Sequence, residues 1–333
     1  MKIALFSTKN YDREYFGKFS HPDIEEITFF ESFLNERTVQ MTRGYDAVCV
    51  FVNDHVNREV LTQLKNNGVT VVALRCAGFN NVDLIAAKEL GIKILRVPAY
   101  SPSAVAEHAL ALILTLNRKT HKAFNRIREG NFSLERLVGF NLDGKTVGVV
   151  GTGKIGQVFC RIMQGFGCKV LAYDLYPNEE LKKKGVEYLA LDELFSRSDI
   201  ISLHCPLTRD TRHMINRAAF QQMKEGVMII NTSRGALLNT KDALQALTDR
   251  KLGYLGIDVY EQEEKLFFKD LSEYIIDDEL IMRLISYPNV LITAHQAFFT
   301  REALDQITRV TMQNLIDYKK GIPLVNEVLP HQD

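Results

Sequence analysis

The stretch Thr146-Val147-Gly148-Val149-Val150-Gly151-Thr152-Gly153-Lys154-Ile155-Gly156 decides the fold of this chain. An apolar, strand-forming run precedes three glycines with the spacing Gly-x-Gly-x-x-Gly, and the apolar periodicity of residues 157–163 predicts a helix directly after them. The first glycine permits a tight turn, the second lets a ligand approach the backbone, and the third allows close packing of helix on strand. The N–H groups at the helix N-terminus then face an anion, so the stretch predicts a site for a dinucleotide pyrophosphate.

The next predicted strand, residues 169–173, ends in Asp174, where a carboxylate can bind the ribose hydroxyls of the adenosine. A carboxylate at this position repels the additional phosphate of NADP. The residues that follow, Leu175, Tyr176 and Pro177, include no arginine or serine to bind that phosphate. The sequence therefore predicts NAD as the cofactor. A glycine turn that only connects strand and helix, and a methyltransferase with a related turn, are the alternatives.

Short apolar runs alternate with helical or polar stretches along the whole chain, which predicts parallel β-sheets covered by helices. The first series of predicted strands comprises residues 3–7, 47–52, 69–74 and 92–97. The second series comprises residues 146–150, 169–173, 200–205, 227–232, 255–259 and 290–293. The pattern occurs twice, and the length of 333 residues exceeds the ~250 at which single cores stop growing. We therefore predict two Rossmann-like or flavodoxin-like α/β domains, with the active site in the cleft between them.

The boundary between the domains is expected at Ser101-Pro102, because serine caps a helix and proline fits its first turn. The last predicted helix, about residues 301–320, ends at Gly321 and is expected to pack back on the first domain. The predicted domains are a discontinuous substrate-binding (catalytic) domain, residues 1–100 plus 299–333, and an NAD-binding Rossmann domain, residues 101–298. Residues 261–286 are acidic and without regular pattern, and we predict a surface excursion beside the active site.

The charge balance disfavours large charged partners. Lysine plus arginine and aspartate plus glutamate number 41 each, so the chain has no electrostatic footprint for nucleic acid or an anionic membrane surface, and we predict a small-molecule partner. The five cysteines are scattered without metal-ligand spacing, which is typical of reduced core thiols in a cytoplasmic protein and predicts no metal site. The N-terminus has no signal-peptide pattern, and the longest apolar stretch, residues 104–116, is shorter than the ~20 residues that cross a bilayer.

Polar side chains follow four strands of the second series. These segments are His204-Cys205-Pro206, Asn231-Thr232-Ser233-Arg234, Asp258-Val259-Tyr260-Glu261 and His295-Gln296-Ala297-Phe298. Ligands of an open parallel sheet bind outside the carboxyl ends of its strands, so these segments are expected to converge on one cleft. The candidates for chemistry are Arg234, Asp258, Glu263 and His295.

Hydride transfer to a 2-oxo acid needs a cation for the carboxylate and a proton donor for the ketone oxygen. The guanidinium of Arg234 can bind a carboxylate bidentately. His295 can donate the proton, and Glu263 can orient its ring and stabilise the imidazolium. The alternatives are a surface salt bridge for Arg234, one of several solvated acids for Glu263, and simple packing for His295. Cys205 is more typical of packing than of chemistry.

Together with these residues, three blocks resemble the D-isomer-specific 2-hydroxyacid dehydrogenase family. The blocks are Arg75-Cys76-Ala77-Gly78-Phe79-Asn80-Asn81-Val82-Asp83, Val97-Pro98-Ala99-Tyr100-Ser101-Pro102 and His295-Gln296-Ala297-Phe298-Phe299. The resemblance covers essentially the whole chain, and within the family it is greatest to the fermentative NAD-dependent D-lactate dehydrogenases.

The resemblance implies a role for each matching residue. Arg234 binds the substrate carboxylate, His295 is the acid/base and Glu263 is its partner. The implied substrate contacts are the backbone amides of Ala77 and Gly78, with Tyr100 and Phe298 or Phe299 closing the pocket around a methyl group. The implied cofactor contacts are Lys154 and Ile155 at the pyrophosphate, Asp174 at the ribose, Cys205 and Pro206 near the adenosine, and Thr232 and Asp258 near the nicotinamide. The family architecture also implies a helical arm that makes a homodimer or homotetramer.

The expected activity is reversible hydride transfer from NADH to pyruvate, giving D-lactate. Relatives that act on glyoxylate, hydroxypyruvate, branched 2-oxo acids or phosphoglycerate share the three catalytic residues and stay open as alternatives. Formate dehydrogenases replace the glutamate partner of the histidine, so Glu263 argues against them. An NADH-sensing protein similar to the transcriptional corepressors also keeps the three residues, but the sequence shows no disordered interaction tails.

Overall fold

The computed structural model describes residues 1–330, which form two compact units. One unit comprises Met1–Ser101 and the segment that begins at Phe299, and the other comprises Pro102–Phe298. In each unit all strands of the main sheet run parallel. The prediction of two α/β domains with parallel sheets is confirmed.

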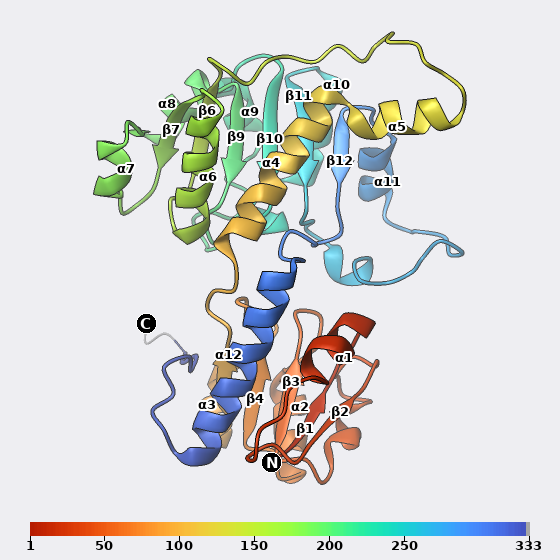
Figure 1. Ribbon diagram of the computed structural model, residues 1–333, viewed down its shortest axis with the longest axis vertical. Helices are drawn as coiled ribbons and strands as arrows, with labels where there is room; N and C mark the ends of the chain where they lie inside the picture. Colours follow the sequence, from red (N-terminus) through yellow and green to blue (C-terminus); the bar gives the residue numbers. More distant parts are fainter. Residues whose placement is uncertain (331–333) are drawn as a thin grey trace. The chain divides into compact units, whose positions relative to one another are not determined.

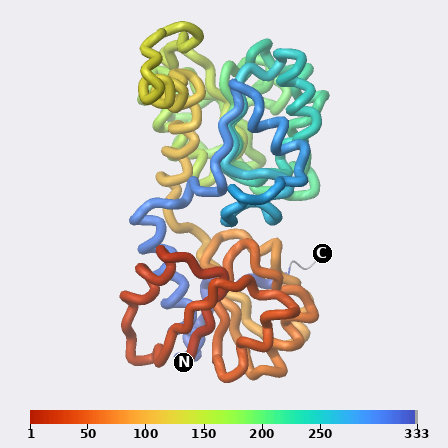
Figure 2. The backbone as a smooth tube through the Cα atoms, turned by 90° about the vertical axis from the view of Figure 1, so that its right-hand side faces the viewer, coloured from red at the N-terminus to blue at the C-terminus, as the bar shows by residue number. Residues whose placement is uncertain are grey.

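The first unit is built on a five-stranded sheet of order β2-β1-β3-β4-β5. Its strands are β1 (Lys2–Leu5), β2 (Glu26–Phe29), β3 (Ala47–Val50), β4 (Val71–Leu74) and β5 (Lys93–Arg96). Its helices are α1 (Asn10–Phe16), the 3-10 helix η1 (Val39–Thr42), α2 (Arg58–Asn66), α3 (Leu84–Leu90) and α12 (Arg301–Lys320). The helix α12 packs on β4 and β5, and Figure 2 shows its blue segment in the same unit as the red and orange residues of the N-terminal part.

The second unit is built on a seven-stranded sheet of order β12-β11-β10-β9-β6-β7-β8 (Figure 1). Its strands are β6 (Thr146–Val150), β7 (Lys169–Tyr173), β8 (Glu187–Tyr188), β9 (Ile200–Leu203), β10 (Val227–Asn231), β11 (Leu252–Ile257) and β12 (Val290–Ile292). Its helices are α4 (Pro102–Arg118), α5 (Thr120–Arg128), α6 (Lys154–Gly165), α7 (Glu179–Lys183), α8 (Leu191–Arg197), α9 (Arg217–Gln222), α10 (Thr240–Thr248), α11 (Glu279–Ser286) and the 3-10 helices η2 (Gly235–Leu237) and η3 (Glu263–Lys265). The order runs outward from β6 in both directions, as in a doubly wound fold.

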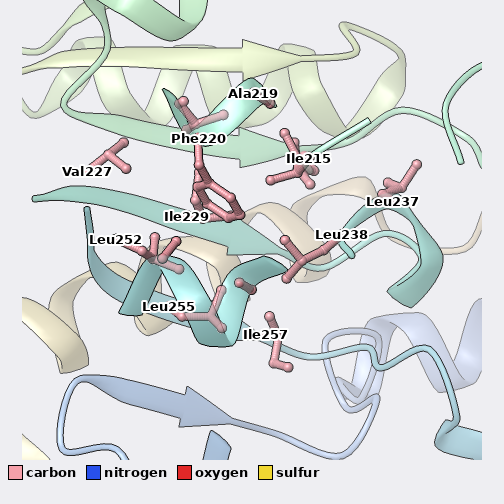
Figure 3. Packing of buried hydrophobic residues seen from close by; sticks show 14 of the residues in the cluster. Ile215, Ala219, Phe220, Val227, Ile229, Leu237, Leu238, Leu252, Leu255 and Ile257 are labelled. Carbon is pink, nitrogen blue, oxygen red and sulfur yellow. The ribbon is translucent and has the colours of Figure 1, made fainter. Parts of the chain in front are cut away.

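Two apolar cores lie on opposite faces of this sheet. Side chains of α4 and α6, such as Leu112 and Phe159, fill one face. Figure 3 shows the other, where Phe220 of α9 packs with Ile229 of β10 and Leu255 of β11. Because both faces are covered, the central strands β9 and β10 are mostly apolar on both sides, with Ser202 and Asn231 as their buried polar residues.

The structure corrects three details of the sequence analysis. The strands β2 and β8 were not predicted. Both lie at sheet edges, and neither contains a buried residue, so their apolar pattern is weak. Residues 261–286 were predicted to be irregular, which is wrong for their last part, where α11 forms. Asp278 caps this helix by accepting hydrogen bonds from the backbone of Leu280 and Ile281.

No helix within residues 1–330 is long and apolar enough to cross a membrane. The five cysteines all lie within the described residues, are buried and form no disulfide: Cys49, Cys76, Cys160, Cys168 and Cys205. Burial raises the pKa of four of these thiols, to about 12 at Cys49 and Cys160 and to about 11 at Cys168 and Cys205. At neutral pH these thiols are therefore protonated core side chains rather than nucleophiles.

Candidate active site and cofactor site

The glycine turn joins β6 to α6, as its sequence predicts. Gly151 has φ +93°, a conformation that side chains rarely adopt, and a Cβ atom there would lie 2.6 Å from the backbone nitrogen of Cys205. A Cβ atom on Gly156 would lie 2.0 Å from the carbonyl oxygen of Gly151, so helix and turn are in contact. Gly153 differs, because a Cβ atom there would meet nothing within 4 Å. The second glycine therefore leaves open space at the helix N-terminus.

The start of α6 can bind an anion. Gly153 is the N-cap residue and brings no side chain to the helix end. Within the described chain, the N–H groups of Lys154, Ile155 and Gly156 make no hydrogen bond, as expected for the first turn of a helix. These N–H groups and the open space above Gly153 fit a pyrophosphate.

Asp174 follows β7 and is held by the backbone around it. Its Oδ2 atom accepts hydrogen bonds from the N–H (2.6 Å) and the hydroxyl (3.1 Å) of Thr152, and its Oδ1 atom accepts from the N–H of Tyr176 (2.9 Å). The hydroxyl of Tyr188 donates to Thr152 Oγ1 at 2.8 Å. The carboxylate is thus fixed beside the glycine turn, where the ribose of a dinucleotide is expected. Sequence reasoning did not find Thr152 or Tyr188, since both support Asp174 only through the fold.

The ends of β9 and β10 supply further cofactor candidates. Thr232 Oγ1 is buried and has no hydrogen-bond partner in the described chain, so this hydroxyl can accept or donate a bond to a ligand. Cys205 places its Sγ atom 3.7 Å from the sulfur of Met214, which is a packing contact. Pro206 is exposed, and its carbonyl accepts a hydrogen bond from Thr211. The role of Cys205 and Pro206 near the adenosine stays a prediction.

His295 and Glu263 form a close pair. The Nδ1 atom of His295 lies 2.9 Å from Glu263 Oε1, and the two side chains are 20% and 19% exposed. The second oxygen of Glu263 accepts a hydrogen bond from the N–H of Tyr260 at 2.9 Å. Because Glu263 takes Nδ1, the Nε2 atom of His295 is the ring nitrogen that can exchange a proton with a substrate. Glu263 is therefore no solvated surface acid.

Asp258 organises the backbone that carries His295. Burial would raise the pKa of the Asp258 carboxyl, but hydrogen bonds from His108, Thr293 and two backbone N–H groups hold it below its ordinary value. Those N–H groups belong to Gln296 (2.9 Å) and Ala297 (2.8 Å). The carbonyl of Asp258 also accepts from the N–H of His295 at 2.8 Å. These bonds stabilise the left-handed backbone of His295, whose φ of +53° costs roughly 1–3 kcal/mol.

Arg234 is a half-buried cation that follows β10. It makes no ion pair with any described residue of its unit, and its only side-chain hydrogen bond there runs from Nη1 to the carbonyl of Ser233 at 2.7 Å. The backbone nearby is held by Asn231, which donates to the Arg234 carbonyl at 2.9 Å. The surface salt bridge weighed for Arg234 is thus absent within this unit. A guanidinium held in this way can bind a carboxylate.

His204 is the other histidine at a strand end, and it differs from His295. Burial lowers the pKa of His204 to about 3, so its ring is neutral at physiological pH. Its Nε2 atom lies 2.9 Å from the Ser202 hydroxyl, and its ring contacts Phe159. His204 is therefore a half-buried packing side chain with a neutral ring. The acid/base candidate at this sheet is His295.

The remaining predicted contacts do not all lie in one unit. Phe298 ends the second unit and is buried, whereas Phe299 begins the C-terminal segment of the first and has its ring 4.8 Å from that of Tyr11. Ala77, Gly78 and Tyr100 also belong to the first unit. Ala77 and Gly78 follow β4, and their N–H groups make no hydrogen bond in the described part of that unit. The roles of these five residues stay predictions.

Comparison with known proteins identifies the family. Residues 110–297 match the model of the D-isomer-specific 2-hydroxyacid dehydrogenase NAD-binding domain. The chain is 54% identical to a D-lactate dehydrogenase of Escherichia coli over 99% of this chain and 100% of that protein. The chain belongs to the D-isomer-specific 2-hydroxyacid dehydrogenase family. The resemblance noted in the sequence is thereby confirmed.

Solved structures of the family show the same fold. The pyruvate reductase of Chlamydomonas reinhardtii superposes with a TM-score of 0.93 at 45% identity, covering 98% of each chain. A D-lactate dehydrogenase from Aquifex aeolicus in complex with NAD and lactic acid superposes with a TM-score of 0.85 at 34% identity, covering 99% of this chain and 100% of that one.

The predicted NAD dependence is confirmed by the family. The chain is an NAD-dependent D-2-hydroxyacid dehydrogenase, and the geometry of the glycine turn, Asp174 and Thr232 fits the dinucleotide. Glu261 is one of the acidic residues that surround Glu263 in the sequence. In the structure its carboxylate is bound by His213 and Thr240. No signal in the sequence links these three residues, because they meet only in the folded chain.

Proposed function

We propose that this chain reduces pyruvate with NADH to D-lactate, in a reversible reaction. The observation that carries the proposal is the His295–Glu263 pair in the same unit as Arg234, whose guanidinium has no acidic partner within that unit. Such a set provides one proton donor and one free cation, which are the groups that a 2-oxo acid requires. The D-lactate dehydrogenase of Escherichia coli supports the choice of substrate by its 54% identity.

The proposed mechanism assigns one task to each side chain. NADH, when bound, supplies the hydride to the carbonyl carbon of the substrate. Arg234 binds the substrate carboxylate and orients the carbonyl group. His295 donates the proton from Nε2 to the oxygen of that group and accepts it in the reverse direction. Glu263 fixes the ring through Nδ1 and stabilises its protonated form.

The cofactor contacts proposed for this chain follow the geometry of the second unit. The N–H groups of Lys154 and Ile155 would bind the pyrophosphate, above the open space at Gly153. The fixed carboxylate of Asp174 would bind the ribose hydroxyls and disfavour NADP. The unpartnered hydroxyl of Thr232 would bind the carboxamide of the nicotinamide.

We propose two further kinds of substrate contact, with the carboxylate and with the methyl group. The N–H groups of Ala77 and Gly78 would donate to the substrate carboxylate, since neither has another partner in its unit. Tyr100, together with Phe298 or Phe299, would contact the methyl group. Larger 2-oxo acids would then be poorer substrates than pyruvate.

An assay of purified protein with a panel of 2-oxo acids tests this function. The panel contains pyruvate, glyoxylate, hydroxypyruvate and a branched 2-oxo acid, each with NADH and with NADPH, and the chirality of the product is determined. We expect the highest kcat/KM for pyruvate with NADH and a D-product. A higher kcat/KM for another 2-oxo acid would show that the chain has the activity of a different member of the family. NADH binding without turnover of any acid would favour a sensing protein instead.

Changing Glu263 to glutamine is expected to shift the pH profile of pyruvate reduction. Reduction requires protonated His295, and the neutral amide no longer stabilises the imidazolium. The pH above which activity falls should therefore move down, because a neighbouring negative charge is lost. The measurement is kcat/KM for pyruvate from pH 5 to 9. Glu264→Gln is the control, because Glu264 is an exposed neighbour; equal profiles for both variants would remove Glu263 from the site.

We also propose that the chain forms a homodimer or a higher homo-oligomer through the segment around α5. No residue of α5 is buried, and large apolar side chains are exposed along residues 124–138. These are Phe124, Ile127, Phe132, Leu134 and Val138, which are 54–81% exposed. An apolar stretch of this length is unusual on a monomer, and a second copy of the same chain can cover it.

Introducing charge into this stretch should dissociate the oligomer. For the double variant Leu134→Asp/Val138→Asp we expect a monomer in sedimentation velocity, where the wild-type chain sediments as a dimer or tetramer. Leu175→Asp is a matched control, since Leu175 is also exposed but lies after β7. An oligomer that persists in the double variant would contradict the assignment of this surface.

For its location we propose the cytoplasm. The five cysteines, all within residues 1–330, are buried and form no disulfide, which suits a reducing compartment. Fractionation of cells that express the tagged chain would test this assignment.

A further inference from the structure

A second histidine–glutamate pair lies outside the site assigned above. His213 Nε2 is 2.6 Å from Glu261 Oε1, and the side chains are 31% and 20% exposed. The other oxygen of Glu261 accepts two hydrogen bonds from Thr240, from its N–H at 2.8 Å and from its hydroxyl at 2.5 Å. The three residues come from the loop after β9, the start of α10 and the loop after β11. Glu261 therefore connects three separate segments.

One side of this cluster leads to Arg234. The N–H of His213 donates to the carbonyl of Ala236 at 2.7 Å, and the N–H of Ile215 donates to that of Leu237 at 3.0 Å. Both carbonyls belong to η2, the single turn that directly follows Arg234. The N–H of Leu237 in turn donates to the Arg234 carbonyl at 3.2 Å. The loop that contains His213 therefore binds, through two backbone hydrogen bonds, the turn that follows Arg234.

The other side leads to Glu263 and His295. A Cβ atom on Gly235 would lie 2.1 Å from the carbonyl carbon of Tyr260. The turn that follows Arg234 is therefore in direct contact with the backbone of Tyr260, the residue before Glu261. The N–H of Tyr260 binds one oxygen of Glu263, whose other oxygen binds His295. Glu261 and Glu263 are thus separated by one residue, Gln262, and both lie next to the Tyr260 backbone that Gly235 and Glu263 contact.

We propose that Glu261 is a positioning residue, which holds the Arg234 turn and the Glu263 loop in register through His213 and Thr240. The proposal rests on the function proposed above for Arg234, Glu263 and His295. Burial would raise the pKa of the Glu261 carboxyl, but the hydrogen bonds from Thr240 and His213 hold it below its ordinary value. The carboxylate is ionised at neutral pH and its bonds to Thr240 are charge-assisted.

The test compares Glu261→Ala with Glu261→Gln. Alanine removes every bond of the cluster. Glutamine keeps an oxygen for Thr240 and offers an N–H₂ group to the ring of His213. For the alanine variant we expect KM for the 2-oxo acid to rise roughly tenfold, as for loss of charge-assisted bonds, and the upper limb of the pH profile to move to lower pH. The glutamine variant should recover most of both changes. The Kd of NADH should stay within about twofold in both, since the glycine turn and Asp174 are held by bonds that do not involve Glu261.

Glu264→Ala is the matched control, because Glu264 is exposed and three positions away. Wild-type KM and pH profile in Glu261→Ala would overturn the proposal. A second result would also overturn the proposal. If Tm, NADH binding and turnover all decreased to a similar degree in Glu261→Ala and glutamine did not restore them, the role of Glu261 would be purely structural. The assay uses the 2-oxo acid that the wild-type chain reduces fastest. Failure with pyruvate then counts against the proposed substrate, whereas failure of the alanine variant to respond counts against Glu261.

Discussion

Replacing His295 with asparagine is expected to lower the turnover of pyruvate roughly 10²–10⁴-fold, which is the usual contribution of a general acid. Asparagine is the suitable substitution because His295 has φ +53°, and asparagine tolerates this left-handed backbone better than alanine does. The amide has no proton to give to the ketone oxygen at neutral pH. Steady-state turnover and a fluorescence titration with NADH measure the two effects separately.

NADH binding should persist in this variant, because Asp174 is held beside the glycine turn by Thr152 and Tyr176 rather than by the His295 loop. His295→Ala should lose activity to a similar degree, with an additional decrease in Tm from backbone strain at this position. If the asparagine variant kept near-wild-type turnover, the proton would come from another group, and the role proposed for His295 would be wrong.

Replacing Arg234 with lysine should raise KM for pyruvate about tenfold to a hundredfold, as for a lost hydrogen bond to a charged group. Lysine keeps the charge but is a point donor, so the planar two-bond contact with the carboxylate is lost. The effect should be seen mainly in KM, provided that Arg234 binds substrate and transition state alike. Steady-state kinetics with pyruvate at saturating NADH provide the measurement.

Arg283→Lys is the control for this experiment, since Arg283 is an exposed cation on α11 of the same unit. It should leave KM unchanged. An unaltered KM in Arg234→Lys as well would mean that the substrate carboxylate is bound elsewhere. The N–H groups of Ala77 and Gly78 would then become the principal candidates.

The fold could be predicted from the sequence because its strongest signals are local. The strand before Gly151, the turn and the helix after it are contiguous, and α12 was predicted with its observed bounds from a continuous apolar periodicity ended by glycine. The edge strands β2 and β8 escaped prediction, since they bury too little apolar surface to show a pattern. The helix α11 was missed within an acidic stretch, although its N-cap Asp278 is a recognisable signal.

For the candidate site, the catalytic residues could be predicted from their types, but the residues that hold them in place by hydrogen bonds could not. His295, Glu263 and Arg234 were recognised because each follows a strand and carries a chemically distinctive group. Their partners could not be recognised, because Tyr260 acts through its backbone N–H and Asp258 acts by holding the N–H groups after His295. Hydrogen bonds from backbone N–H groups do not require a particular side chain, so they cannot be recognised in the sequence.

The sequence by itself therefore determined that the chain forms parallel-sheet domains with a dinucleotide turn, since apolar periodicity and glycine spacing act over a few residues. Only the tertiary structure decided that Nδ1 of His295 is held by Glu263, that the ring of His204 is neutral, and that Glu261 links the loops of Arg234 and Glu263. These properties depend on burial and on contacts between residues 20–50 positions apart in the chain. Distances across such separations arise only when the strands pair and the helices close over the sheet.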